Sequence, residues 1–356
     1  MNKQKYLEID GAFGEGGGSI LRLGVGFSVL FNQPVKFFNI RVNRPKPGLR
    51  LQHLLGLQTL ANLTGSKLSA VDGECKVGTK ELTFEPNLQI IDKINVNVNT
   101  AASIGLLLQP IQISSLCFTQ TDKIEIFIKG GGTFGKWAPS LNYLMNVTYQ
   151  ILKKCGLEIL IDIKEHGFYP KGGALIKCTI IPPKSKLKSL YLRELGNVDL
   201  IEGEIIVSNL IRRNVGERIK KSIEQEIRVK TKIETNINYF SVNSISPGVG
   251  ICLWANSDSG AIISSGTVLG ERNTTSEKLG KITAKEILKY IMNDIPIDNY
   301  LSDQLIPLIA FSKEPSSLKV LEITSHTKTN LELVKLFTNR KYEIIQDRKS
   351  FIIQYN

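Results

Sequence analysis

His326 is a candidate catalytic residue of this chain. It is one of 3 histidines and stands in the run "LEITSHTKTN", residues 321–330. A strand-like run ends at Ile323 and a helical pattern begins near Asn330, which predicts that the imidazole lies on the turn between them. A neutral imidazole can act as a general base or as a nucleophile toward phosphorus. The alternative is a histidine satisfied by nearby backbone, and His166 in "KEHGFYPKGG" is a further candidate.

A glycine-rich segment, "DGAFGEGGGSILR", follows a strand-like run and opens a helix. Its backbone amides can hold phosphate oxygens at the helix N-terminus, although it has neither GK[ST] nor a complete GxGxxG. Glu15 inside the segment is a candidate ligand for a divalent metal. The alternatives are a tight turn without a ligand and a solvated loop carboxylate.

Arginines and two polar residues gather around the loop "RVNRPKPGLR" and the glycine-rich segment. A rigid loop with several guanidinium groups suits bidentate contact with phosphate, while a surface loop with solvated arginines is the alternative. The residues are Arg22, Arg41, Arg44 and Arg50, with Gln52 and His53 directly after the loop.

Two further helices carry polar candidates. Tyr300, Asp303 and Gln304 stand at the start of a helix whose other face is apolar, and for Asp303 an N-terminal cap competes with a catalytic role. Gln109 lies in the otherwise apolar helix "SIGLLLQPIQ", where a structural hydrogen bond is the alternative to a role in binding.

Composition favours a globular protein with a polyanionic partner. The chain has 356 residues, 42% hydrophobic and 22% charged, and no stretch is apolar for long enough to span a bilayer. The N-terminus lacks an apolar signal region, so we expect a cytoplasmic protein without a membrane partner. Five single cysteines favour free thiols. The net charge of +12 favours nucleic acid or nucleotide as partner, with solubility as the alternative use.

One supersecondary pattern, βαβαββ, repeats along the chain. The first copy covers strand- and helix-like runs from residue 6 to 86, and the second covers runs from 94 to 181. The third ends the chain with a helix at 301–311, a strand at 318–324, a helix at 330–339 and two strands, while its opening strand has no clear signal. We therefore expect an α/β (α+β) fold with a large core domain of three βαβαββ units.

A segment with its own strand and helix signals separates the second and third copies. The expected division is 1–183 for core repeats one and two, 184–275 for a small inserted α/β domain, and 276–356 for repeat three. The basic stretch around Arg212, Arg213, Lys220 and Lys221 in the insert is either an RNA contact or a solvated helix face.

The unusual residues fall on connections of one type. In α/β folds, ligands bind beyond the carboxyl ends of the strands, where β-to-α connections lie. The glycine-rich segment, the arginine loop, "KGGGTFGKWAPS", "NYLSDQ" and "TSHTKTN" all occupy such connections in the predicted pattern. This coincidence predicts one active site built from several repeats.

The motifs of the chain resemble, in order, those of the RNA 3′-terminal phosphate cyclase family. The resemblance covers nearly the whole chain and implies three βαβαββ units with a small α/β insert. The matching motifs are "DGAFGEGGGSILR", "NIRVNRPKPGLRLQHL", "ELTFEP", "SIGLLLQ", "GGGT" with "WAPS", "GFYPKGG", "GICLWA", "LGER", "YLSDQL" and "SHTKTNLELVKLF".

The resemblance implies a reaction and assigns residues to it. The family activates an RNA 3′-phosphate with ATP and a divalent cation (Mg²⁺ or Mn²⁺), closes it onto the adjacent 2′-hydroxyl, and releases AMP and pyrophosphate. It implies that His326 is the nucleophile that forms a histidine-AMP intermediate, and that Glu15 binds metal. The nucleotide-site residues that it implies are Glu15, Arg22, Arg41, Arg44, Gln52, His53, Gln109, Tyr300, Asp303 and Gln304.

Alternatives of other classes stay open. The cyclase-like branch of the same superfamily acts in ribosome assembly without cyclase activity and lacks the nucleophilic histidine, so His326 within "HTKTN" favours the catalytic branch. A plain RNA-binding protein would interleave aromatic and basic residues on strands, and "VKFFNIRV" is the short run that comes nearest. A different transferase on a similar repeated fold would not account for His326.

Overall fold

The core consists of four-stranded sheets that share one strand order. The computed structural model describes residues 5–71, 73–210, 214–338 and 340–355. The sheet orders are β1-β2-β4-β3, β5-β6-β8-β7 and β9-β15-β17-β16. In each sheet the first two strands are parallel and the remaining neighbours are antiparallel. This confirms the predicted α/β class and the βαβαββ repeat.

Unit one follows the predicted order closely. Its elements are β1 (Leu7–Asp10), α1 (Gly18–Phe31), β2 (Val35–Phe38), α2 (Leu51–Thr64), β3 (Lys67–Ala70) and β4 (Leu82–Glu85). Both helices end at a left-handed residue, Asn32 (φ 49°) after α1 and Gly65 (φ 67°) after α2. Helix α1 is buried along nearly its whole length, which explains its apolar sequence.

Unit two divides its second predicted helix. The elements are β5 (Lys93–Ser103), α3 (Ile104–Ser114), a 3₁₀ turn (Ser115–Cys117), β6 (Ile124–Gly132), α4 (Leu141–Tyr143), a π-helical segment (Leu144–Thr148), α5 (Tyr149–Cys155), β7 (Glu158–Glu165) and β8 (Leu175–Ile181). The single helix predicted over 140–156 is thus helical throughout but widens at its centre.

Unit three begins before the insert. Its opening strand is β9 (Tyr191–Leu192), which pairs in parallel with β15 (Ser316–Val320). A strand this short has no readable periodicity, which explains the missing signal. The other elements are α8 (Asn299–Ile309), α9 (Ser325–Phe337), β16 (Tyr342–Asp347) and β17 (Ser350–Tyr355). The insert therefore lies within the first β-to-α connection of this unit.

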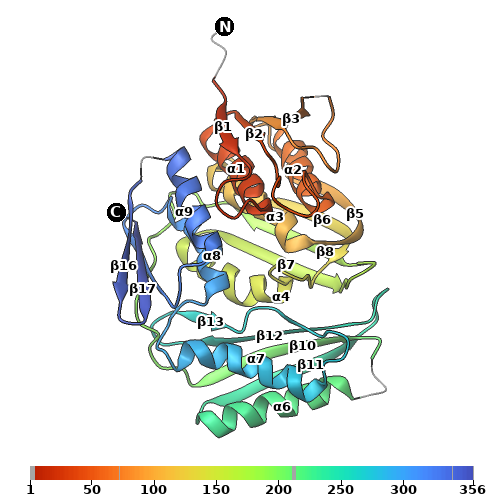
Figure 1. The fold of residues 1–356 in the computed structure, drawn as a ribbon, viewed down its shortest axis with the longest axis vertical. Coiled ribbons are helices and arrows are strands. Elements are labelled where there is room, and N and C mark those ends of the chain that lie inside the picture. Colours follow the sequence, from red (N-terminus) through yellow and green to blue (C-terminus); the bar gives the residue numbers. More distant parts are fainter. Residues whose placement is uncertain (1–4, 72, 211–213, 339, 356) are drawn as a thin grey trace.

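The insert forms a separate sheet with two helices on one face (Figure 1). Helix α7 packs against α6, β12 and β13, and it buries Leu279, Thr283 and Ile287. Sheet pairing and packing favour an insert of residues 200–291 in place of the expected 184–275, with α7 on the insert side of the boundary. The elements are β10 (Leu200–Ser208), α6 (Val215–Lys230), β11 (Glu234–Val242), β12 (Gly248–Asn256), β13 (Ile262–Ser264), β14 (Val268–Leu269) and α7 (Ser276–Ile291).

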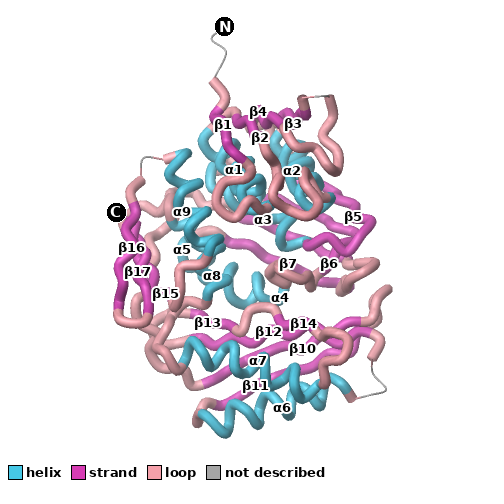
Figure 2. Tube along the Cα trace, viewed as in Figure 1, coloured by secondary structure: helices cyan, strands magenta, loops and turns pink. Residues whose placement is uncertain are grey.

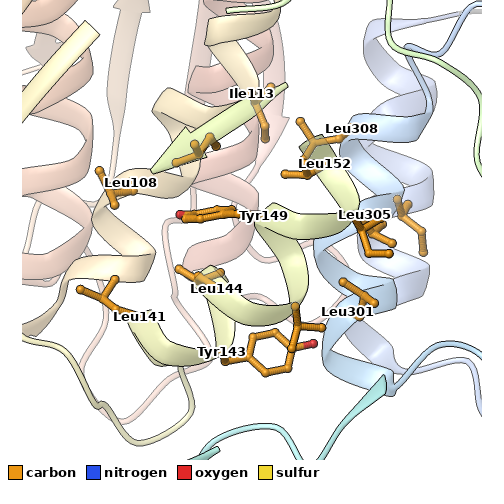
Figure 3. Close-up of a cluster of buried hydrophobic side chains, with 14 of the residues drawn as sticks. Leu108, Ile113, Leu141, Tyr143, Leu144, Tyr149, Leu152, Leu301, Leu305 and Leu308 are labelled. Atoms are coloured by element: carbon orange, nitrogen blue, oxygen red, sulfur yellow. The ribbon is translucent and has the colours of Figure 1, made fainter. Parts of the chain in front are cut away.

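Helices of the three units pack together and form the centre of the core. Figure 2 shows α1, α2 and α3 between the strands of unit one and those of unit two. Figure 3 shows Leu108 and Ile113 of α3, Tyr149 and Leu152 of α5, and leucines of α8 in one buried cluster. Phe27 of α1 contacts two aromatic rings of unit three, with centroid distances of 5.5 and 5.3 Å. Among the described helices, none is long and apolar enough to cross a membrane.

Candidate active site

The N-termini of α1 and α9 meet and bring Glu15 and His326 together. His326 Nδ1 lies 3.0 Å from Glu15 Oε1. His326 occupies the first turn of α9, so the prediction that it lies on a turn before the helix is wrong. The reason is a cap, because Thr324 Oγ1 accepts a hydrogen bond from Thr327 N at 2.9 Å and starts the helix at Ser325.

Backbone and side-chain contacts fix the loop that carries Glu15. Arg44 Nη2 donates to the Glu15 carbonyl oxygen at 2.7 Å and lies 3.7 Å from Oε2 of its carboxylate. Glu15 N donates to Thr329 Oγ1 of α9 at 3.2 Å. Gly14 has a φ of +56°, and a Cβ atom there would lie 2.3 Å from Thr329 Oγ1. Glycine is thus required both by the backbone conformation and by the close approach of α9.

The Glu15 carboxylate affects His326 and has capacity for a cation. It raises the pKa of His326 above its ordinary value, first through the direct contact and then through its charge. Glu15 Oε1 is buried and makes no well-aligned hydrogen bond within the described residues, although His326 Nδ1 is close. Such an oxygen fits a divalent cation. The described residues contain no group of three or more His, Cys, Asp or Glu that could hold a metal.

Arginines converge on the same region. Arg22 is buried in α1, donates from Nε to Gln109 Oε1 at 2.7 Å, and has a pKa lowered to about 10 by burial and the Arg41 charge. Burial and the charges of Arg44 and Arg50 lower the pKa of Arg41. Its Nε atom is buried and has no hydrogen-bond partner in the described part of the chain. Crowded, incompletely paired guanidinium groups form a site that an anion would stabilise.

His53 is held neutral beside this cluster. Its Nδ1 accepts a hydrogen bond from Arg50 N at 3.3 Å, which leaves the proton on Nε2. Burial, followed by the Arg22 and Arg41 charges, lowers its pKa to about 2. A Cβ atom on Gly18 would lie 2.1 Å from His53 Nε2, so the imidazole lies directly against the start of α1. Gln52, half-buried, shares the first turn of α2.

Asp303 positions the start of α9. Its Oδ1 accepts hydrogen bonds from Thr324 Oγ1 at 2.8 Å and Thr327 Oγ1 at 2.7 Å. Burial raises its pKa. The alternative role as an N-terminal cap is wrong, because Asp298 caps α8 by accepting from the backbone of Tyr300 and Leu301.

Tyr300 and Gln304 lie on the same helix as Asp303 and contact unit two. Gln304 Oε1 accepts from Thr148 Oγ1 at 3.1 Å. Tyr300 is 52% exposed, and its ring centroid lies 6.4 Å from that of Tyr143. The exposed ring is available to a ligand.

Sequence reasoning missed the threonines around His326. Thr324, Thr327 and Thr329 link α9 to Asp303 and Glu15. Their signal was visible in "TSHTKTN", where three threonines flank the histidine. His166 instead bonds to Thr133 Oγ1 at 3.0 Å, and burial lowers its pKa to about 4.

Comparison with known proteins shows the family of the chain. The sequence profile described as RNA 3′-terminal phosphate cyclase matches residues 13–344. The chain belongs to the RNA 3′-terminal phosphate cyclase family. Proteins named RNA 3′-terminal phosphate cyclase are 38% identical in Thermococcus gammatolerans, over 96% of this chain and 94% of that protein, and 36% identical in Pyrococcus abyssi, over 95% of each. In Methanosarcina barkeri the identity is 37%, over 95% of this chain and 96% of the relative.

Matches to the RNA 3′-terminal phosphate cyclase family run through both core and insert. The profile includes the glycine-rich loop, the insert and α9, so the loop that carries Glu15 and the helix that carries His326 both lie within it. A solved structure, the enolpyruvyl transferase NikO from Streptomyces tendae, is 13% identical, with a TM-score of 0.27 over 49% of this chain and 33% of its own.

Proposed function

We propose that the chain converts an RNA 3′-terminal phosphate to a 2′,3′-cyclic phosphodiester with ATP, through a histidine-AMP intermediate on His326. The observation that carries the proposal is the contact between His326 Nδ1 and Glu15 Oε1 at 3.0 Å. The contact orients the imidazole by one nitrogen and leaves Nε2 available as a nucleophile. Family membership and the surrounding arginines support the same reaction.

The first step joins the nucleotide to the protein. His326 Nε2 attacks the α-phosphorus of ATP, the P–N bond forms, and the bond to pyrophosphate breaks. A neutral imidazole is needed, so the pKa of His326, raised by Glu15, predicts that the rate increases with pH. Glu15 would hold a divalent cation, which supplies charge neutralisation for the pyrophosphate. The charge of Arg22, Arg41 and Arg44 favours the same leaving group.

The remaining steps act on RNA. An oxygen of the RNA 3′-phosphate attacks the AMP phosphorus and releases His326. The adjacent 2′-hydroxyl then attacks the activated 3′-phosphorus. The cyclic phosphate forms as the bond between this phosphorus and the AMP oxygen breaks, and AMP leaves. This last step depends chiefly on positioning, because nucleophile and target belong to one nucleotide.

Covalent labelling tests the proposal. The native chain, His326→Ala and His166→Ala are incubated with ATP labelled at the α-phosphate and with Mg²⁺ or Mn²⁺, then denatured. We expect acid-labile, alkali-stable label on the native chain and on His166→Ala, and none on His326→Ala, as a phosphoramidate requires. RNA with a 3′-phosphate should then discharge the label and acquire a cyclic end. If the folded native chain takes no label, the proposal of an enzyme fails, and the alternative of a non-catalytic RNA-binding protein that acts in ribosome assembly takes its place.

A further inference from the structure

A row of lysines follows one face of α7 in the insert. Lys278, Lys281, Lys285 and Lys289 recur at steps of three and four residues, which puts them on one side of the helix. All four side chains are exposed. With a rise of about 1.5 Å per residue, the row extends over about 16 Å. These four residues are called the lysine row.

The lysine row is not neutralised by neighbouring carboxylates. None of its members forms an ion pair within the described ranges. Helix α7 has two glutamates, and Glu277 is already paired with Arg218 at 2.8 Å. The other, Glu286, is half-buried, and its charge adds to burial in raising the pKa of Tyr300 in the candidate active site. The row is therefore a line of positive charge along an exposed helix face.

Helix α6 differs in this respect, although it is equally basic. Lys220 pairs with Glu224 at 3.8 Å, Lys221 pairs with Glu217 at 3.2 Å, and the lysine at position 230 pairs with Glu226 at 3.2 Å. Such pairs of residues four apart stabilise a helix and cancel its field. The alternative role that the sequence offered for this stretch, a solvated helix face, thus fits Lys220 and Lys221, while Arg212 and Arg213 lie outside the described residues.

The lysine row borders a shallow hollow and leads toward the candidate active site. The hollow has a volume of about 420 Å³ and is lined by Thr275, Glu277, Lys278, Lys281, Ile282 and Lys285. At the other end of α7, Tyr290 OH accepts a hydrogen bond from Asn299 N at 3.3 Å. Asn299 begins α8, which carries Tyr300 and Asp303. Figure 1 shows α7 between α6 and the core.

We propose that the lysine row binds the phosphate backbone of the RNA substrate upstream of its 3′ end. The inference rests on the proposed function and adds the path of the RNA body to it. Unpaired lysines attract consecutive phosphates without reading base sequence. A row that runs from the insert toward α8 would hold the RNA body while its end reaches His326.

A charge-matched comparison tests the proposal. The row variant carries Lys278→Gln, Lys281→Gln and Lys285→Gln, and the control variant carries Lys220→Gln, Lys221→Gln and Lys230→Gln. Both lose the same net charge, and glutamine keeps a helix propensity near that of lysine. Affinity is measured against salt for 3′-phosphorylated RNA of about 20 nucleotides and for a 3′-phosphorylated dinucleotide. Self-labelling with ATP, which needs no RNA, checks the active site of each variant.

The row variant should lose affinity for the long RNA and keep its affinity for the dinucleotide. Single-stranded RNA gives a salt slope of about −0.7 per phosphate contact, so three lost contacts reduce the slope by about 2 and the affinity at about 0.1 M salt by roughly 100-fold. An equal loss in the control variant, an equal loss for the dinucleotide, or no loss at all overturns the proposal. If the native chain labels His326 but neither binds nor cyclises RNA, the proposed function itself fails.

Discussion

We expect the buried charge of Arg22 to destabilise the ligand-free protein and to favour the binding of an anion. Its guanidinium is buried, and within the described residues no carboxylate forms an ion pair with it. Burial and Arg41 lower its pKa from 12.5 to about 10. At about 1.4 kcal/mol per pKa unit, the difference of about 2.5 corresponds to roughly 3 kcal/mol. Loss of the hydrogen bond that the charged guanidinium makes to Gln109 offsets about 2 kcal/mol of this, so Arg22→Met should raise the free energy of unfolding by about 1 kcal/mol.

Urea unfolding with and without ATP and Mg²⁺ measures this effect. The exposed Arg228, on α6, gives a control, because Arg228→Met removes the same charge without relieving a buried one. We expect the control to change stability by less than about 0.5 kcal/mol. Nucleotide should stabilise the native chain more than it stabilises the Arg22→Met variant, because the stabilisation by a ligand increases with its affinity for the folded state.

The opposite sign would refute the reasoning. If Arg22→Met lowers the free energy of unfolding while nucleotide stabilises it as much as the native chain, Arg22 is a structural residue whose contacts outweigh its burial. Loss of covalent labelling in a variant that is more stable than the native chain would instead separate function from folding at this position.

Other expectations concern the parts that hold the site. Asp303→Ala removes two hydrogen bonds to threonines of α9, at about 1.5–3 kcal/mol each, and should reduce labelling more than Asp303→Asn, which keeps an acceptor. Because Glu15 raises the pKa of His326, the stability that this contact gives is full below pH 6.5 and is lost as pH rises through the raised pKa. Glu15→Gln should therefore lower the midpoint of the His326 titration followed by NMR. An unchanged midpoint would contradict the assignment. Phe27→Ala should cost about 3–5 kcal/mol in thermal or urea unfolding, and Phe31→Ala, at a 37% exposed position, clearly less.

Local sequence pattern was sufficient for most of the core. The helices at α1, α2 and α3 were predictable because apolar residues recur with the helical period and a small or left-handed residue ends two of them. The order of strands and helices along each unit followed from the repeat, while the order of strands within each sheet came from the structure. The two-residue strand β9 was not predictable, because its pairing with β15 depends on a segment more than a hundred residues away.

The amphipathic sequence of a helix does not show which domain the helix belongs to. Helix α7 has an amphipathic sequence that suits either the insert or unit three, and only its packing against α6 and the insert's sheet decides between them.

The start of helix α9 was not predicted from its apolar pattern, because that pattern begins after the first residue of the helix. The cap at Thr324 is a polar signal, and a search for apolar periodicity does not detect it.

The sequence by itself determined the repeat, the candidate residues of the site and the family that its motifs resemble, because each depends on residue type and spacing. Tertiary structure decided which of those residues act on one another. Glu15 reaches α9 across 314 positions of sequence through Thr329, and it contacts His326 in the same loop-to-helix junction. Burial and neighbouring charge set the pKa directions of Arg22, His53 and His326, and both depend on packing that no local pattern specifies.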